Sequence, residues 1–273
     1  MQVHCMGLLE LDSQVIFAFL LTLAAGLSTG IGSVLGLLNR RFSPRVLTVA
    51  LSFSAGVMLY VSFVEIFPKA RQALTAALGA PLGYTITVLA FFAGIAAIAL
   101  VDQLLPQHQG PLPTVSQHHS SRPELLRTGL FSALAIAIHN FPEGLATFIG
   151  ALTSPRLGIG IALAIAIHNI PEGLAVSAPI YYATGSRRLA FWISLASGLA
   201  EPVGAVIGYV FLRSVLNDLV FGLVFASVAG VMIYICLDEL LPTAQRMASH
   251  HQLMIVSVLA GMGVMSISLV LLA

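Results

Sequence analysis

Eight long apolar runs divide the chain, and they constrain its fold more than any other feature. Each reaches the roughly 20 residues that a helix needs to cross a bilayer, and they span 14–38, 46–67, 82–105, 126–152, 156–184, 187–213, 218–242 and 252–272. Only 8% of the residues are charged, against about 25% in soluble domains. We therefore predict an all-α integral membrane protein: one transmembrane domain over 1–273, an eight-helix bundle with inverted-repeat character.

Charge and cysteine content give no sign of other classes of protein. The net charge of +1 gives no indication of nucleic-acid binding. Cys5 and Cys236 are the only cysteines and lie far apart in the sequence, so neither a disulfide framework nor a thiolate site is indicated. Lipid is the expected surrounding of the chain.

Basic residues predict the orientation, because cytoplasmic loops carry an excess of Lys and Arg. An N-terminus outside the cytoplasm gives eight cytoplasmic arginines against four outer basic residues, and eight spans then place the C-terminus outside as well. The cytoplasmic set is Arg40, Arg41, Arg45, Arg122, Arg127, Arg187, Arg188 and Arg246, and the outer set is Lys69, Arg71, Arg156 and Arg213. The run 14–38 lacks a basic flank before it, which favours a span over a cleaved signal.

One loop is longer than the others and is predicted to be cytoplasmic. Residues 106–123 carry four prolines and the histidines His108, His118 and His119. Proline and polar density favour a disordered linker. Clustered histidines also fit a loose metal-catching segment, and the sequence leaves both readings open.

Two segments of the chain are nearly identical. Residues 133–146 read ALAIAIHNFPEGLA and residues 162–175 read ALAIAIHNIPEGLA, so thirteen of fourteen positions match. Ionisable groups in a membrane span are costly and need partners. A duplicated set of nitrogen and oxygen ligands indicates a metal ion as that partner, and the candidate ligands are His139, Asn140, Glu143, His168, Asn169 and Glu172.

Helical spacing places each glutamate between its neighbours. At about 100° per residue, the Asn lies about 100° from the His, and the Glu, four residues on, lies about 40° from it. A carboxylate has two oxygens, so Glu143 and Glu172 can each face both sides. The spacing predicts two metals bridged by these carboxylates, one on the histidine side and one on the asparagine side, roughly 4 Å apart.

Depth supports this arrangement. A short turn at 153–156 makes the two motif helices antiparallel, and each motif lies near the middle of its run. The six side chains can therefore converge at the bilayer centre. Pro142 and Pro171 deprive the carbonyls of Ile138 and Ile167 of their helical partners, so we expect both helices to open beside the ligands.

Glu201 is a third acid within an apolar run, followed by Pro202, and it would suit the asparagine-side metal. A charged residue at the bilayer centre costs about 3 kcal/mol, so three unpaired glutamates would cost on the order of 10 kcal/mol. Bound dications offset this cost. The alternative is that some glutamates are protonated when the site is empty, which would link metal binding to proton release.

Weaker signals lie near the ends of other runs. Glu65 either lines a pathway or ends its helix, and Met58 is either packing or a soft ligand. Asp102, Asp238 and Glu239 fall at predicted cytoplasmic ends, where they either pass on an ion or are solvated helix ends.

The paired HNFPEG and HNIPEG segments resemble the signatures of the ZIP family of divalent metal transporters, and with Glu201-Pro202 they look like its ZupT-like bacterial branch. The resemblance covers nearly the whole chain. It implies uptake of zinc, and often of iron, manganese, cobalt or cadmium, into the cytoplasm. Some family members have Gln-Asp at the positions of His168-Asn169, which leaves open how this chain ranks zinc against iron.

The resemblance also implies ligand sets for a binuclear centre. One site would use His139, Glu143, His168 and Glu172, with Met58 as a weaker candidate. The other would use Asn140, Glu143, Asn169, Glu172 and Glu201. Asp102 and Glu239 match family positions on the cytoplasmic exit route.

We therefore predict a multi-pass cell-membrane carrier, not an enzyme, that moves divalent transition metals as substrates and needs no cofactor. The rival is an intramembrane di-metal hydrolase, although the chain has no His-Glu-x-x-His segment. A passive metal-sensing or structural protein, with the motif side chains as buried interhelical pairs, is a third reading. The oligomeric state stays open, a homodimer included.

Overall fold

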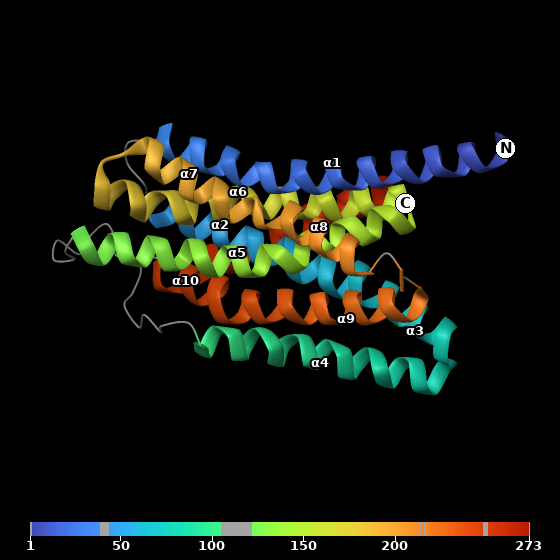
Figure 1. The fold of residues 1–273 in the computed structure, drawn as a ribbon. Helices are drawn as coiled ribbons and strands as arrows, with labels where there is room; N and C mark the ends of the chain where they lie inside the picture. The colour runs from blue at the N-terminus through green and yellow to red at the C-terminus, as the bar shows by residue number, and fades with distance from the viewer. Residues whose placement is uncertain are drawn as a thin grey trace.

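Helices make up the described part of the chain in the computed structural model, which covers residues 2–38, 44–104, 122–212, 214–215, 217–247 and 251–272. The elements are α1 (Gln2–Leu38), α2 (Pro44–Val61), η1 (Ser62–Ile66), α3 (Phe67–Leu78), α4 (Ala80–Leu104), α5 (Arg122–Thr153), α6 (Pro155–Thr184), α7 (Arg187–Gly198), α8 (Ala200–Leu212), α9 (Asp218–Ile235), η2 (Cys236–Leu240), α10 (Leu241–Met247) and α11 (His251–Leu272). The predicted all-α bundle is confirmed (Figure 1).

Seven helical segments of the described residues are long and apolar enough to cross a bilayer. They include Ser13–Leu38, which agrees with a first span. The eighth predicted span falls in α5, which is not among the seven. Its 32 residues include the polar motif as well as a polar first turn, and both lower its mean hydropathy. α5 nevertheless runs alongside the other long helices (Figure 1).

The helices pack as two units. The motif unit consists of α1, α5, α6, α7 and α8. The flanking unit consists of two groups, α2 with α10 and α11 and α9 with α3 and α4, which meet mainly at the π-helical turns η1 and η2. The main contacts between the units are α2 against α6 and α9 against α5. Both motif helices therefore lie at the boundary between the two units.

Reciprocal helix crossings reveal the inverted repeat. Where α2 crosses α11, and where α4 crosses α9, a glycine of each helix packs against a backbone carbonyl of the other; the four glycines are Gly56, Gly261, Gly94 and Gly230. In the motif unit, Gly26 and Gly198 face each other's carbonyls across α1 and α7. The α1–α4 part and the α7–α11 part thus repeat one arrangement around the α5–α6 hairpin.

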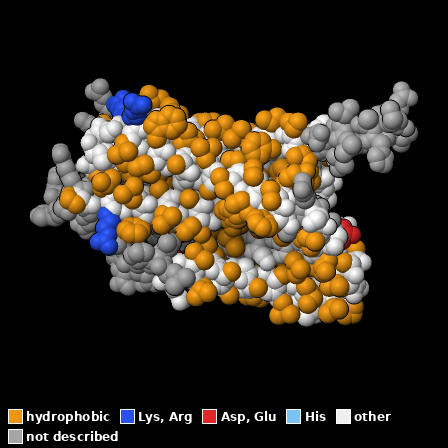
Figure 2. Space-filling view, viewed as in Figure 1, with side chains coloured by type: hydrophobic (Ala, Val, Ile, Leu, Met, Phe, Trp, Pro, Cys, Tyr) orange, Lys and Arg blue, Asp and Glu red, His pale blue; other side chains and the backbone are white. Residues whose placement is uncertain are grey.

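The outer surface of the bundle is apolar. Hydrophobic side chains cover much of the visible face, and the basic groups that can be seen in this view lie near one end (Figure 2). Large hydrophobic side chains are exposed on nearly every long helix, as expected of a surface that faces lipid. Most of the loop 106–123, with its three histidines, lies outside the described residues.

Candidate metal centre

A tight turn sets the two motif helices side by side. α5 ends at Thr153 and α6 begins at Pro155, and the N–H of Ser154 donates to the carbonyl of Gly150 at 2.9 Å. Pro155 suits the first position of a helix, where its missing N–H costs no hydrogen bond. The two helices therefore pack as the antiparallel pair that the sequence predicts.

Both helices continue through their motif prolines. α5 contains Pro142 and α6 contains Pro171, and each helix is unbroken in the structure. The expected opening of these helices beside the ligands is therefore wrong at the level of secondary structure. The helix that is interrupted carries the third acid: α7 ends at Gly198 and α8 begins at Ala200, which places Glu201 in the first turn of α8.

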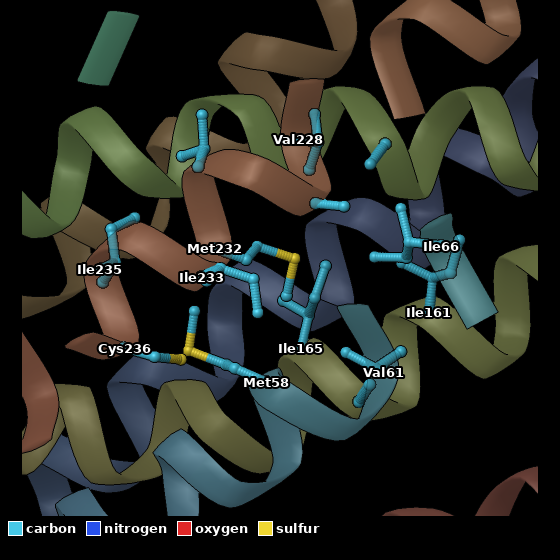
Figure 3. Packing of buried hydrophobic residues seen from close by; sticks show 14 of the residues in the cluster. Met58, Val61, Ile66, Ile161, Ile165, Val228, Met232, Ile233, Ile235 and Cys236 are labelled. Atoms are coloured by element: carbon cyan, nitrogen blue, oxygen red, sulfur yellow. The ribbon is translucent and has the colours of Figure 1, made fainter. Parts of the chain in front are cut away.

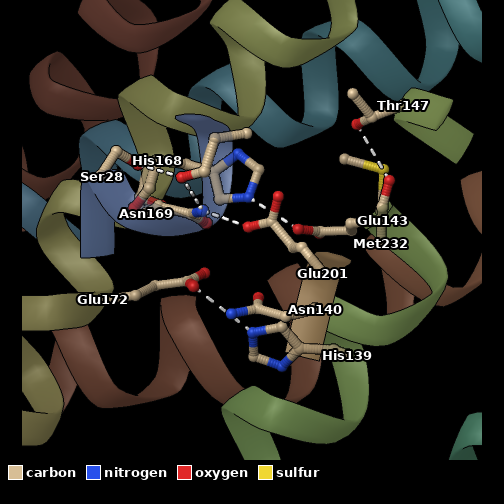
Figure 4. A network of polar contacts seen from close by, with 12 residues as sticks. Ser28, His139, Asn140, Glu143, Thr147, His168, Asn169, Glu172, Glu201 and Met232 are labelled. Carbon is tan, nitrogen blue, oxygen red and sulfur yellow. Dashed lines mark hydrogen bonds and ion pairs between the residues drawn. The ribbon is translucent and has the colours of Figure 1, made fainter. Parts of the chain in front are cut away.

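The histidines of the two motifs pair across the hairpin with each other's glutamates. His168 Nε2 lies 3.0 Å from Glu143 Oε2, and His139 Nε2 lies 3.5 Å from Glu172 Oε2. All four side chains are at most 1% exposed. Each carboxylate thus reaches the imidazole of the opposite helix (Figure 4).

The asparagines attach the hairpin to the neighbouring helices. Asn140 Nδ2 donates to the carbonyl of Ser197 on α7 at 3.1 Å, and Asn169 Nδ2 donates to the carbonyl of Ala25 on α1 at 3.0 Å. Asn169 Nδ2 also donates to Glu201 Oε1. The structure therefore brings Glu201 to the asparagine of the second motif.

Glycines permit this close packing. The Cα of Gly144 faces the carbonyl of Glu201, and the Cα of Gly173 faces the carbonyl of Thr29, so closely that a Cβ at either position would overlap a backbone oxygen. Small residues allow helix backbones to approach in this way. The last position of each HNxPEG motif therefore holds the helices together rather than serving as a ligand.

All seven principal candidates keep a buried polar atom without a hydrogen-bond partner. Eight such atoms lie on these residues: His139 Nε2, Asn140 Oδ1, Glu143 Oε1, His168 Nδ1, Asn169 Oδ1, Glu172 Oε1 and Oε2, and Glu201 Oε2. The other unpaired buried side-chain atoms in the described residues are four hydroxyls. Buried polar groups are nearly always satisfied, so this concentration calls for a ligand.

The side chains nevertheless meet as pairs. Within the described residues, no three His, Cys, Asp or Glu side chains lie close enough together to hold a metal ion as they stand. A shared metal would require the carboxylates to turn from the imidazoles by a rotamer change. The two ligand sets expected from the sequence therefore remain predictions.

The weaker candidates lie in different places. Glu239 approaches the centre, with Oε2 3.8 Å from His139 Nδ1, and is 36% exposed. Asp102 accepts a hydrogen bond from Tyr234 at 3.4 Å and lies one helix further out. Met58 is fully buried in the apolar core beside Cys236 (Figure 3). The structure thus links Glu239, but not Asp102, directly to a motif histidine.

The sequence did not identify the backbone carbonyls that accept hydrogen bonds from the two motif asparagines. The carbonyls of Ala25 and Ser197 occupy equivalent positions of a second duplication, in which 23–36 (LAAGLSTGIGSVLG) matches 195–208 (LASGLAEPVGAVIG) at seven of fourteen positions. The recurring glycines of these two spans indicate by themselves only close helix packing. An alignment of the first span with the sixth would have identified this pair.

Comparison with known proteins decides the family. The model of the ZIP zinc transporter family matches residues 12–128 and 107–269. The chain is 58% identical over 267 residues to the zinc transporter ZupT of Chlorobaculum parvum, covering 96% of this chain and 99% of that protein. The chain belongs to the ZIP zinc transporter family. Zinc transporters ZupT of Chlorobium chlorochromatii and Nitratidesulfovibrio vulgaris are 57% and 54% identical, over 96% and 95% of this chain and 99% and 98% of those proteins.

Membership of the ZIP family confirms the resemblance to its ZupT-like branch and the multi-pass membrane class. The relatives are named as transporters, not as enzymes. The intramembrane hydrolase reading therefore falls away. For a ZIP chain, a buried set of unsatisfied ligands on helices at the boundary of two helix units is a candidate binding site for the carried ion.

Proposed function

We propose that this chain carries Zn²⁺ across the cell membrane into the cytoplasm and binds it in the middle of the bilayer. The single observation that carries the proposal is the set of eight buried atoms without a hydrogen bond on His139, Asn140, Glu143, His168, Asn169, Glu172 and Glu201. Imidazole nitrogen with carboxylate and amide oxygen is a ligand set that suits borderline dications. The names of the relatives, zinc transporters ZupT, support the same substrate.

The site would hold two ions. Each motif glutamate has one oxygen 3.0 or 3.5 Å from an imidazole of the opposite helix, and Glu201 touches the amide of Asn169. Turning Glu143 and Glu172 away from the imidazoles places one oxygen of each toward a histidine-side ion and the other toward an asparagine-side ion. Three ionised carboxylates with two dications carry a net charge of about +1, which removes most of the cost of burying them.

The same donors fit several metals. Two imidazoles with hard oxygens suit Zn²⁺, Fe²⁺, Co²⁺, Mn²⁺ and Cd²⁺ better than soft Cu⁺, so we propose a range of divalent substrates led by zinc. The asparagine amides are neutral ligands. They keep the affinity below that of a closed structural zinc site, which allows the ion to leave.

Transport requires access from each side in turn. The motif helices lie at the boundary of the two units, and the partly exposed Glu239 contacts His139. We propose that the motif unit shifts against the flanking unit, and that Glu239 receives the ion on the cytoplasmic side. Asp102, hydrogen-bonded to Tyr234 five residues before Glu239, lies further along that exit.

Zinc uptake into proteoliposomes tests the proposal. The native chain is expected to give saturable uptake, and Glu143→Ala with Glu172→Ala is expected to abolish it. Asp218→Ala removes a carboxylate at the first residue of α9, outside the motif. It serves as the matched control and keeps native uptake. Absence of uptake by the native chain contradicts the function, whereas native uptake by the double variant contradicts the site.

A further inference from the structure

The second and seventh spans contain copies of one segment. Residues 55–70 read AGVMLYVSFVEIFPKA and residues 229–244 read AGVMIYICLDELLPTA, so eight of sixteen positions are identical. The duplication pairs Met58 with Met232 and Glu65 with Glu239. Glu239 contacts a motif histidine in this structure. Its counterpart in the second span, Glu65, is therefore a candidate for the same contact.

The two copies share an unusual backbone. In each, the α-helix changes to a five-residue π-helical turn at the same point, η1 (Ser62–Ile66) in one and η2 (Cys236–Leu240) in the other, and a short α-helix follows. Glu65 and Glu239 are the fourth residues of these turns. Isolated π-turns are rare and concentrate at functional sites, so the shared distortion marks both glutamates.

The copies lie at opposite ends of the bundle. Glu239 is near the end that we propose to be cytoplasmic, whereas Glu65 lines a cavity of about 560 Å³ at the other end, beside the α5–α6 turn at Thr153 and Ser154. Elements of both units line this cavity. Glu65 therefore lies on the outer side of the site at the same boundary between units.

The same repeat also relates the two motif histidines to each other. α9, which leads into Glu239, packs against α5 and His139, whereas α2, which leads into Glu65, packs against α6. Ser54 of α2 donates to the carbonyl of His168 at 3.4 Å. The symmetry of the repeat that relates Glu239 to Glu65 thus also relates His139 to His168.

An apolar layer lies between the outer cavity, which reaches Gly160 on α6, and His168 further along the same helix. It contains Val61, Ile66, Ile161 and Ile165, none more than 1% exposed (Figure 3). The outer route is therefore closed, while His139 already meets the partly exposed Glu239.

We propose that Glu65 is the outer counterpart of Glu239: when the motif unit moves toward the outer cavity, Glu65 pairs with His168, and the pair of Glu239 with His139 separates. This inference rests on the proposed function. Glu65 would then be the first carboxylate to receive a hydrated dication from outside, and Glu239 the last to release it inside.

Sided zinc flux tests this assignment, with right-side-out and inside-out membrane vesicles that contain the full chain. Glu65→Gln is expected to raise the half-saturating zinc concentration about tenfold when zinc is presented to the outer face, and to leave the value for the cytoplasmic face unchanged. Glu239→Gln is expected to do the reverse. Asp218→Asn, which removes another carboxylate of the same cavity, leaves both values unchanged.

The outcomes separate this inference from the proposed function. Native vesicles without zinc flux contradict the function itself. Native flux that Glu65→Gln leaves unchanged, or that it alters equally from both faces, overturns only the assignment of Glu65. A purely structural role of Glu65 would change the half-saturating zinc concentration at both faces alike.

Bridging by Hg²⁺ gives a second readout that does not depend on flux. In a chain with Cys5→Ser and Cys236→Ser, Glu65→Cys with His168→Cys is expected to lose its maleimide-reactive thiols on adding Hg²⁺. Glu239→Cys with His139→Cys is the control pair, close together in this structure. Bridging of the control pair but not of the first pair overturns the proposal.

Discussion

His168 on α6 and Glu143 on α5 lie 3.0 Å apart, Nε2 to Oε2, with both side chains fully buried. The matching pair, His139 with Glu172, is 3.5 Å apart. Each helix thus supplies the acid for the other's imidazole. Both contacts form without a metal, so an arriving dication competes with the imidazoles for the carboxylates. The following predictions derive from this exchange and from the packing around it.

His168→Gln is expected to weaken the binding of zinc more than the binding of manganese. The change replaces a borderline nitrogen ligand with a hard amide oxygen. Uptake of labelled zinc in competition with manganese measures the effect: the excess of manganese that halves zinc uptake should fall about tenfold. An unchanged ratio would show that His168 does not contact the carried ion.

Glu201→Gln is expected to reduce zinc binding from two ions to one. Glutamine keeps the size of the side chain but removes the charge next to Asn169, while the histidine side keeps its own ligands. Elemental analysis of the purified protein after equilibrium dialysis counts the zinc. Glu201→Asp, which preserves the charge, is expected to retain more of the second ion. Two zinc ions bound to the Glu201→Gln variant at native affinity would show that Glu201 is not a zinc ligand.

Gly144→Ala is expected to destabilise the fold. The added methyl group would overlap the carbonyl of Glu201, so α5 and α8 must separate, at a cost of about 1–3 kcal/mol. Gly263→Ala on α11 is the matched control because a Cβ there meets no atom within 4 Å, and alanine favours a helix by about 1 kcal/mol. Circular dichroism during heating in detergent should show a lower midpoint for the first variant only.

The orientation can be tested with one cysteine at each end of the motif unit. In a chain with Cys5→Ser and Cys236→Ser, Thr153→Cys should react with a membrane-impermeant maleimide in intact cells. Arg188→Cys, at a position that is also exposed in the structure, should react only after the membrane is permeabilised. The reverse pattern would place both termini in the cytoplasm.

The helix bundle and the motif hairpin could be predicted because their signals are local. Apolar runs of membrane-spanning length locate the helices, and the antiparallel turn at Ser154 aligns two motifs that lie near mid-span. Prediction was weaker where packing overrides local chemistry. Pro142 and Pro171 remain inside continuous helices, since the surrounding helices hold the backbone in place.

Other features depend on tertiary contacts. The break at Leu199 and the π-turns at Glu65 and Glu239 have no separate signature in hydrophobic periodicity. The contact of Glu239 with His139 joins the seventh predicted span to the fourth, which spacing along one helix cannot show. Comparing the two halves of the chain would have paired Glu65 with Glu239, but the break at Leu199 has no counterpart at the matching Leu27, because α1 is continuous there.

Anomalous X-ray scattering at the zinc edge, from crystals of the zinc-loaded chain, tests the central claim most directly. Two peaks are expected roughly 4 Å apart, between α5 and α6, one nearer His139 and His168 and the other nearer Asn169 and Glu201. Zinc found only outside the α5–α6 hairpin, with the two imidazole–carboxylate pairs intact, would contradict the account.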